Sequence, residues 1–157
     1  MGLQGCARTV QQPFVSTIVN KLDAKGRVSV PALFRQILGA QGTQGIYCIR
    51  ALVHPALDGF GDALNAEFQD RLQSLDPLFD EDYDAQAQLM FGASNFLPFD
   101  DEGRVRIPDA LIAFTGITER VSFVGLGRKF QIWDPTRFEP VERARFERAR
   151  ALRRGMP

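Results

Sequence analysis

The sequence is poor in the residues from which metal sites, disulfide frameworks and catalytic centres are built. Its 157 residues include one histidine and two cysteines, and no apolar run approaches the roughly 20 residues that a membrane span needs. Cys6 and Cys48 make no disulfide framework, and a single histidine excludes a His-rich metal site. The N-terminus lacks the basic and apolar segments of a secretion signal. We therefore expect a cytoplasmic protein with no metal, no cofactor and no membrane partner.

An enzyme is the first function class that these shortages argue against. No histidine, cysteine and carboxylate residues occur at ligand spacing, and no glycine-rich phosphate loop precedes a helix. Ser29 has no candidate histidine base. His54, beside a proline, is interpreted as a loop residue and Trp133 as a core anchor. We expect no catalytic residues and no small-molecule substrate.

Net charge is zero, but the charges are distributed unevenly along the chain. Twelve acids and one base lie between Ala51 and Gly103, so the remainder carries eighteen bases and seven acids. The acidic middle either leaves a basic face elsewhere and repels DNA from the wrong surface, or simply solvates two helices. Both interpretations remain open from the sequence.

An internal repeat is the most informative feature. The segment Leu22–Pro31 (LDAKGRVSVP) reappears 77 residues later as Phe99–Pro108 (FDDEGRVRIP). After each proline comes a short helical pattern, then a Gly-Ile pair and a strand-like run, as in Tyr47–Arg50 and Val121–Gly125. Two homologous halves are therefore predicted.

Each repeat has the pattern of a hairpin turn. Asp23 and Asp100 can accept backbone N–H bonds, and Gly26 and Gly103 can supply the left-handed conformation that closes the turn. The β-branched alternation that follows indicates a strand with one buried face, and proline then suits the first turn of a helix. Each half is predicted to run strand, turn, strand, short helix, strand.

Helices are expected between and after the halves. Apolar residues at three- and four-residue spacing predict a helical pair joined near Pro77, and Asp134 is a candidate N-cap for a helix from Pro135 to about Leu152. Seven arginines lie in or just after this last helix, where they contact phosphates, a neighbouring subunit or only solvent. The predicted division is a disordered extension (1–13), a first half (14–57), a helical insert (58–94), a second half (95–140), and a C-terminal arginine-rich helix and tail (135–157).

These motifs together resemble the MraZ family of AbrB-like regulators. Asp23–Pro31 is similar to the first family signature and Asp101–Pro108 to the second, while Phe130–Asp134 resembles the closing strand. A lone Asp-x-x-Gly-Arg motif occurs in many hairpins, but two copies and the Trp-Asp ending are specific. The order and spacing agree over about residues 14 to 140.

The resemblance implies a fold and a function. The fold class is α+β, a duplicated swapped-hairpin β-barrel of the double-psi type with the inserted helical pair and the C-terminal helix. The implied function is a nucleoid-associated transcriptional regulator, usually a repressor. It binds short repeated boxes of double-stranded DNA upstream of the bacterial cell-division and cell-wall gene cluster, as a ring-shaped homo-oligomer. The alternative is an antitoxin-like AbrB module that binds a partner protein as well as DNA.

The resemblance also assigns residues. Arg27 and Arg104 match the DNA-contacting arginines, Lys25 is a phosphate contact, and Asp23 and Asp100 shape the turns. Glu102 replaces the lysine in the second copy, so the two turns are expected to grip DNA unequally. Arg35 and Arg106 either join the DNA-binding set or are ordinary surface charges, and Ile112 stands where a base is expected. The alternative is that each turn arginine pairs with its own aspartate and only stabilises the turn.

Overall fold

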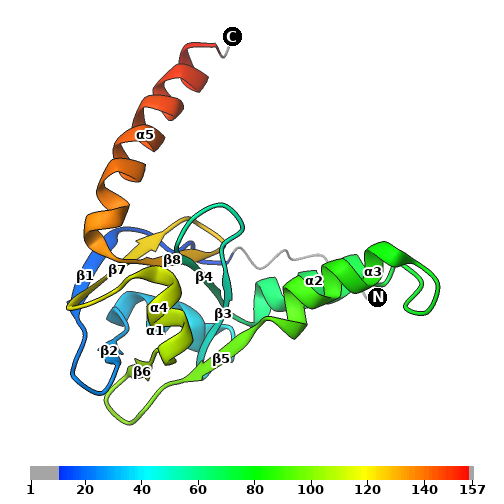
Figure 1. The fold of residues 1–157 in the computed structure, drawn as a ribbon, viewed down its shortest axis with the longest axis horizontal. Helices are drawn as coiled ribbons and strands as arrows, with labels where there is room; N and C mark the ends of the chain where they lie inside the picture. The colour runs from blue at the N-terminus through cyan, green and yellow to red at the C-terminus, as the bar shows by residue number, and fades with distance from the viewer. Residues whose placement is uncertain (1–10, 156–157) are drawn as a thin grey trace, which may run out of the picture.

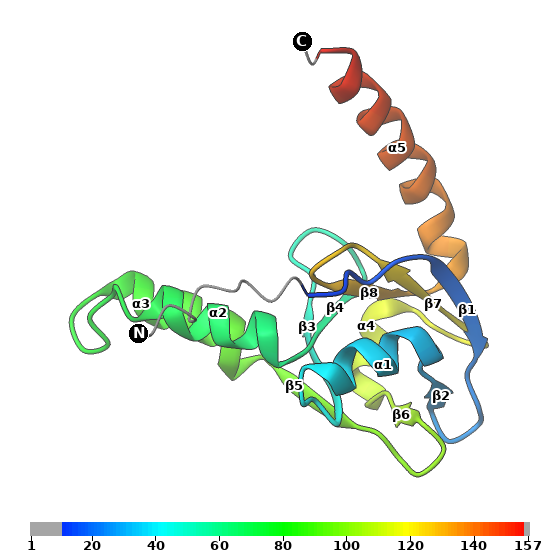
Figure 2. The same ribbon diagram turned by 180° about the vertical axis from the view of Figure 1, so that it is seen from behind.

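The computed structural model describes residues 11–155, which form an α+β fold with two antiparallel β-sheets, confirming the predicted class. The larger sheet has the order β1-β7-β8-β4-β3-β5, and a separate ribbon pairs β2 with β6 (Figures 1 and 2). The strands are β1 (Thr17–Lys21), β2 (Arg27–Ser29), β3 (Gly45–Arg50), β4 (Leu57–Phe60), β5 (Asn95–Pro98), β6 (Arg104–Arg106), β7 (Arg120–Gly125) and β8 (Phe130–Trp133). The helical segments are α1 (Ala32–Ala40), α2 (Asp62–Leu72), α3 (Glu81–Ala87), the π-helical η2 (Gln88–Gly92), α4 (Asp109–Thr115) and α5 (Pro135–Arg154).

The two halves repeat the same order of elements, β1-β2-α1-β3-β4 and β5-β6-α4-β7-β8, and they exchange strands. β1 pairs with β7, and β5 pairs with β3, so each half completes the sheet of the other. Each repeat therefore closes its own turn, while its two strands form their ladders with strands of the other half. In the first half the isolated bridge between Leu22 and Val28 and the bond from the Asp23 amide to the Arg27 carbonyl join the two arms of the turn, whereas the ladders of β1 and β2 are formed with β7 and β6.

Aromatic rings fill the centre of the core. The ring of Phe34 on α1 lies 5.3 Å from that of Phe14 and 5.1 Å from that of Phe130, and Phe123 completes the cluster. All four side chains are buried. Gly59 in β4 faces the Phe130 ring, and a Cβ there would lie 2.5 Å from it, so only glycine allows this close approach.

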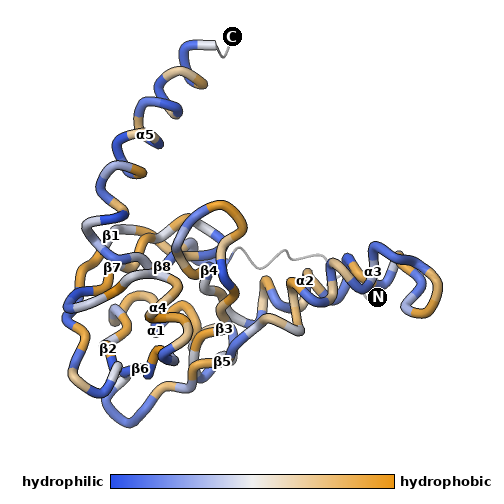
Figure 3. Tube along the Cα trace, in the orientation of Figure 1, coloured by the Kyte–Doolittle hydropathy of each residue, from blue (hydrophilic) through white to orange (hydrophobic). Residues whose placement is uncertain are grey.

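The helical insert forms an arm that projects away from the sheets (Figures 1 and 2). It begins at Asp62, because the residues Leu57–Phe60 form β4 and pair with β3 and β8; this corrects the boundary that we placed at residue 58. Only Leu72 is buried along the helices of the arm, while Phe68 packs on Phe60 at the base. The predicted apolar stripe therefore packs within the arm and at its base, and the apolar loop at the tip stays exposed (Figure 3).

The last helix, α5, follows the capping pattern that the sequence predicted. The Asp134 carboxylate accepts a hydrogen bond from the Arg137 amide, and Phe138 packs against Trp133. Beyond this first part the helix leaves the core, and Phe146 and Leu152 are exposed (Figure 1).

Two further expectations concern the ends and the helices of the chain. Residues 1–10 of the extension predicted to be disordered lie outside the described residues, as do the last two residues of the predicted tail, whereas residues 11–13 form no regular secondary structure. No helix within residues 11–155 combines the length and the hydropathy needed to cross a bilayer.

The enclosed core predicts the cost of truncating it. Leu38 on α1 is fully buried, so Leu38→Ala should lower the free energy of unfolding by about 2–5 kcal/mol in urea denaturation. The matched control is Leu52→Ala, because Leu52 is 78% exposed and should change stability by less than about 0.5 kcal/mol. Equal losses in the two variants would contradict this description of the core.

Candidate nucleic-acid interface

The first repeated turn is closed by one aspartate and one glycine. Asp23 Oδ1 accepts hydrogen bonds from the amides of Lys25 (2.9 Å) and Arg27 (2.8 Å), and the Asp23 amide donates to the Arg27 carbonyl (2.9 Å). Gly26 has φ +80°, a conformation that L-residues with a Cβ rarely adopt. The turn is therefore fixed by its own backbone and by one carboxylate.

The second turn reproduces these contacts 77 residues later. Asp100 Oδ1 accepts from the amides of Glu102 and Arg104, both at 2.9 Å, and its own amide donates to the Arg104 carbonyl at 2.8 Å. Gly103 has φ +76°. The repeat in the sequence thus encodes two turns of the same geometry.

Reciprocal backbone bonds hold the two turns side by side. The Gly26 carbonyl accepts from the Ile107 amide (2.9 Å), and the Gly103 carbonyl accepts from the Val30 amide (3.1 Å). Each turn is thereby anchored on the strand end of the other half. Both turns protrude at the same end of the molecule (Figures 1 and 2).

The ribbon between the turns has one buried and one exposed face. Val28 and Val105 are opposite each other and buried. Arg27 pairs with Arg106, and Ser29 with Arg104, so these four side chains share the outer face: Arg27, Ser29, Arg104 and Arg106. The sequence did not single out Ser29 for this face, because the register between the halves is invisible in either repeat alone.

The turn aspartates also orient the arginine side chains. Asp23 Oδ2 accepts from Arg27 Nε (2.7 Å), and Asp100 Oδ2 accepts from Arg104 Nε (2.9 Å). Each aspartate–arginine pair stabilises its turn, but a hydrogen bond through Nε leaves the two Nη groups of the guanidinium available to another acceptor. Glu102 lies 3.6 Å from Arg104 Nη1, and this weak competition has no counterpart at Arg27 among the described residues.

The hydrogen bonds of the turns shift the acidity of their side chains. The bond from the Arg27 amide, with smaller help from the Arg27 side chain, lowers the pKa of Asp23 below 3.8. The Arg104 amide does the same to the pKa of Asp100. The side-chain bond to Asp100 raises the pKa of Arg104. The two turn carboxylates and the Arg104 guanidinium therefore remain charged at neutral pH.

The remaining basic side chains that the sequence predicted for this site are distributed unequally between the two turns. Arg35 donates through Nε to the Val30 carbonyl (3.0 Å), and its guanidinium lies beside Gly103, where a Cβ would be 2.8 Å away. It therefore borders the second turn. Lys25 belongs to the first turn and is exposed, and in the part of the chain that the structure describes neither Lys25 nor Arg106 forms an ion pair.

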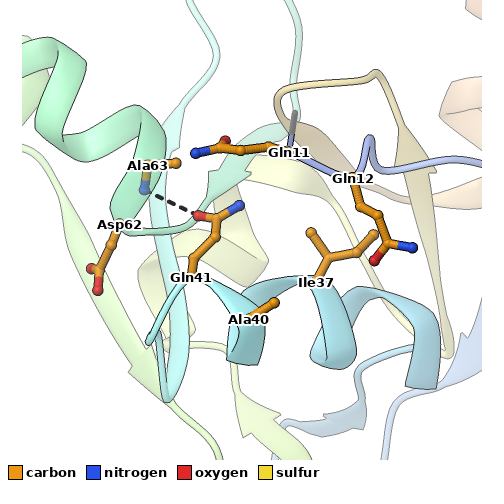
Figure 4. A pocket seen from close by; sticks show the side chains of 7 residues that line it. All are labelled: Gln11, Gln12, Ile37, Ala40, Gln41, Asp62 and Ala63. Atoms are coloured by element: carbon orange, nitrogen blue, oxygen red, sulfur yellow. Dashed lines mark hydrogen bonds between the residues drawn. The ribbon is translucent and has the colours of Figure 1, made fainter. Parts of the chain in front are cut away.

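A separate cleft of about 480 Å³ lies between α1 and the start of α2 (Figure 4). Its polar groups serve the fold, since Gln41 Oε1 accepts from the Ala63 amide (3.0 Å) and thereby caps the first turn of α2. No group of three or more His, Cys, Asp or Glu side chains within residues 11–155 is arranged to hold a metal. The turns therefore remain the candidate site.

Comparison with known proteins agrees with the motifs. A family model described as "MraZ protein, putative antitoxin-like" matches residues 90–154. The chain is 43% identical over 143 residues to the transcriptional regulator MraZ of Xanthobacter autotrophicus, covering 91% of this chain and 90% of that protein. It is 45% identical over 142 residues to the transcriptional regulator MraZ of Methylocella silvestris, covering 90% and 85% of the two chains. The corresponding protein of Azorhizobium caulinodans is 41% identical over 143 residues, again covering 91% and 90%.

The class that these relatives define is that of transcriptional regulators, not enzymes, as the sequence predicted. The chain belongs to the MraZ family. The family resemblance of the two Asp-x-x-Gly-Arg motifs is thereby confirmed, and the similarity extends over nine-tenths of the chain.

The lowered pKa values of the turn aspartates predict a pH dependence. Ionised Asp23 and Asp100 stabilise the fold, so this contribution is complete above the unfolded value near 3.8 and is lost as pH falls through the lower folded pKa. The Asp23→Asn/Asp100→Asn variant should be less stable than the wild type at neutral pH, and the difference should shrink in acid. Urea denaturation across pH measures it.

The matched control for this experiment is Asp101→Asn, because Asp101 lies in the second turn but its carboxylate accepts no hydrogen bond from the described residues. The free energy of unfolding of this control should differ little from that of the wild type at every pH. A stability difference of the double variant that grows in acid would refute the assigned direction of the pKa shifts.

Proposed function

We propose that this protein binds double-stranded DNA through the outer face of the β2–β6 ribbon and thereby regulates transcription. One observation carries the proposal: Arg27 and Arg104, each held by its own aspartate, share this face with Arg106. Placing Arg27 directly opposite Arg106 is unfavourable in isolation, because like charges on paired strands repel. A polyanion would relieve that repulsion.

The geometry of the β2–β6 ribbon suits direct contacts with the edges of DNA bases. A two-stranded ribbon fits the major groove, which is about 12 Å wide, and the free Nη groups of an oriented arginine can donate to guanine O6 and N7. Arg27 and Arg104 would read bases in this way. Lys25, Arg35 and Arg106 would contact phosphates and position the ribbon without reading sequence.

Repeated protein units fit repeated DNA boxes. We propose that several copies assemble into a ring-shaped homo-oligomer on the nucleoid, in the cytoplasm, and engage successive boxes upstream of the cell-division and cell-wall gene cluster, repressing it. Linked sites increase affinity through effective concentration. The exchange of β1 and β5 between the halves supports a swapped-hairpin barrel of the double-psi type as the fold that presents the ribbon.

The central test is fluorescence anisotropy on the DNA upstream of the protein's own gene. Arg27→Ala and Arg104→Ala should each weaken binding by roughly 5- to 150-fold, the equivalent of about 1–3 kcal/mol for one bidentate base contact. Arg71→Ala is the matched control, because Arg71 is exposed on α2, away from the ribbon, and should bind like the wild type. If both ribbon variants bind as tightly as the wild type, the arginines only staple their turns.

The two turns differ in charge, and this difference predicts a substitution that should increase the affinity for DNA. Glu102→Lys would remove the acid beside Arg104 and give the second turn the lysine that the first turn has at the matching position. The variant should therefore bind DNA more tightly. The slope of log K against log salt should steepen by about 0.9 for the added phosphate contact. Asp70→Lys changes the net charge equally on the exposed surface of the arm and is the control. An unchanged slope would mean that the second turn does not touch DNA.

The matched family model is described as antitoxin-like, which favours a second candidate, a module that binds a partner protein as well as DNA. The two functions differ in one requirement. A regulator of the proposed kind binds DNA as the purified chain alone, whereas the module would need its partner for tight binding. The anisotropy measurement therefore separates them.

A further inference from the structure

Two surfaces of opposite charge project from the core in different directions. The acidic tip, residues 76–84, comprises the end of the loop between α2 and α3 and the first turn of α3, and it carries five acids and no base. The arginine helix, residues 143–154 of α5, carries six arginines and one acid. Figures 1 and 2 show that the arm and α5 extend apart from each other, so the two surfaces of one chain do not meet.

The acidic tip presents an aromatic side chain in a fixed loop. Phe79 is 85% exposed and Leu78 is 81% exposed. Asp76 Oδ1 accepts from the Leu78 amide (2.8 Å), and Asp80 Oδ1 caps α3 at the Asp82 amide (2.9 Å). These two acids shape the loop. The remaining tip acids are free of such hydrogen bonds among the described residues: Glu81, Asp82 and Asp84.

The arginine helix borders an apolar groove of about 270 Å³ between α5 and the end of β7. Its apolar walls include Phe146 and Ala149 from the helix and Leu126 from the loop after β7. Arg150 and Arg153 lie four and seven residues after Phe146, on the same side of the helix. This edge of the groove is therefore an exposed aromatic ring flanked by guanidiniums.

Arg145 and one acid, Glu142, also line this groove, but Arg145 is engaged in contacts with the sheet. Its Nη2 donates to Gln131 Oε1 (2.9 Å), and its guanidinium lies 5.8 Å from the centre of the Trp133 ring. Burial lowers its pKa. Arg145 thus fixes α5 on the sheet, whereas the arginines further along the helix remain exposed.

We propose that the acidic tip of one copy docks into the α5 groove of the next copy, with Phe79 in the groove and Glu81 and Asp82 facing Arg150 and Arg153. A contact between two different surfaces of the same chain is heterologous, and it forms a ring where the rotation closes. The inference rests on the proposed ring-forming regulator and names the contact that builds it. Charge complementarity and the two exposed aromatic side chains select a second copy as the occupant.

DNA fits the arginine helix less well. The turns protrude at one end of the core, and α5 leaves from the opposite side in both views (Figures 1 and 2). A duplex on the ribbon would therefore leave the helix of the same copy pointing away from it. A role of the helix in DNA binding is an outcome that the following test would detect.

The test uses two neutralising variants of the full chain and light scattering after size exclusion. The tip variant is Phe79→Ser/Glu81→Gln/Asp82→Asn, and the groove variant is Phe146→Ser/Arg150→Gln. Each should be monomeric at concentrations where the wild type is oligomeric, because loss of a buried aromatic anchor commonly weakens an interface by roughly 30-fold or more. High salt should also dissociate the wild type.

Mixing provides the sharper readout. The tip variant keeps an intact groove and the groove variant keeps an intact tip, so a 1:1 mixture should form a heterodimer of twice the monomer mass and stop there. Circular dichroism verifies folding, and Phe79→Ser alone is the milder tip variant, since Phe79 is 85% exposed. Glu119→Lys is the control, an exposed charge reversal that should retain the wild-type mass.

Three outcomes would overturn the proposal: a monomeric wild type, variants that retain the wild-type mass, or a mixture that forms no heterodimer. A groove variant of wild-type mass that loses DNA affinity would assign the helix to DNA instead. Failure of the DNA-binding proposal looks different, because Arg27→Ala would then bind like the wild type while its mass stays that of the oligomer. On DNA with a single box, the tip variant should bind through its own ribbon.

Discussion

Pairing of β2 with β6 is the constraint on which the rest of the structure depends. Three residues from each half form this ribbon, and the carbonyls of Gly26 and Gly103 extend it by accepting from the opposite half. These bonds place two turns that are 77 residues apart in the sequence at one end of the molecule. Without this pairing, Arg27 would lie on one hairpin and Arg104 and Arg106 on another, and an isolated hairpin is marginally stable in water.

The exchange is symmetric in the backbone but not in charge. Both turns use the same aspartate and glycine geometry, and the two copies differ in side chains that leave the backbone bonds intact. Glu102 occupies the place of Lys25, and Ile112 that of Arg35. Arg106, opposite Arg27, adds a base to the first turn, whereas Glu102 weakens the second. The ribbon is thus graded from a more basic end to a less basic one.

Residue patterns predicted the local features, whereas strand exchange between the halves was expected only from the family resemblance. Each turn, each short helix and the cap of α5 depend on residues a few positions apart, so the motifs identified them. Strand exchange depends on which edges meet in three dimensions, and one repeat is compatible with either a closed hairpin or an exchanged one. The same limit hid the pairing of Arg27 with Arg106. The start of the arm was misplaced because the short strand β4 contains Asp58 and Gly59, which are uncommon in strands.

Zero net charge is compatible with a DNA-binding ribbon because the charges are separated in space. α2 has eleven residues and is therefore about 16 Å long, which exceeds the screening length of about 10 Å at 0.1 M salt. Acids beyond α2 consequently contribute little to the potential at the ribbon. Asp101 and Glu102 lie within the second turn itself and are not screened in this way. The acids close to the proposed DNA interface are thus few and local, and the acidic tip is free to contact a partner at the far end of the arm.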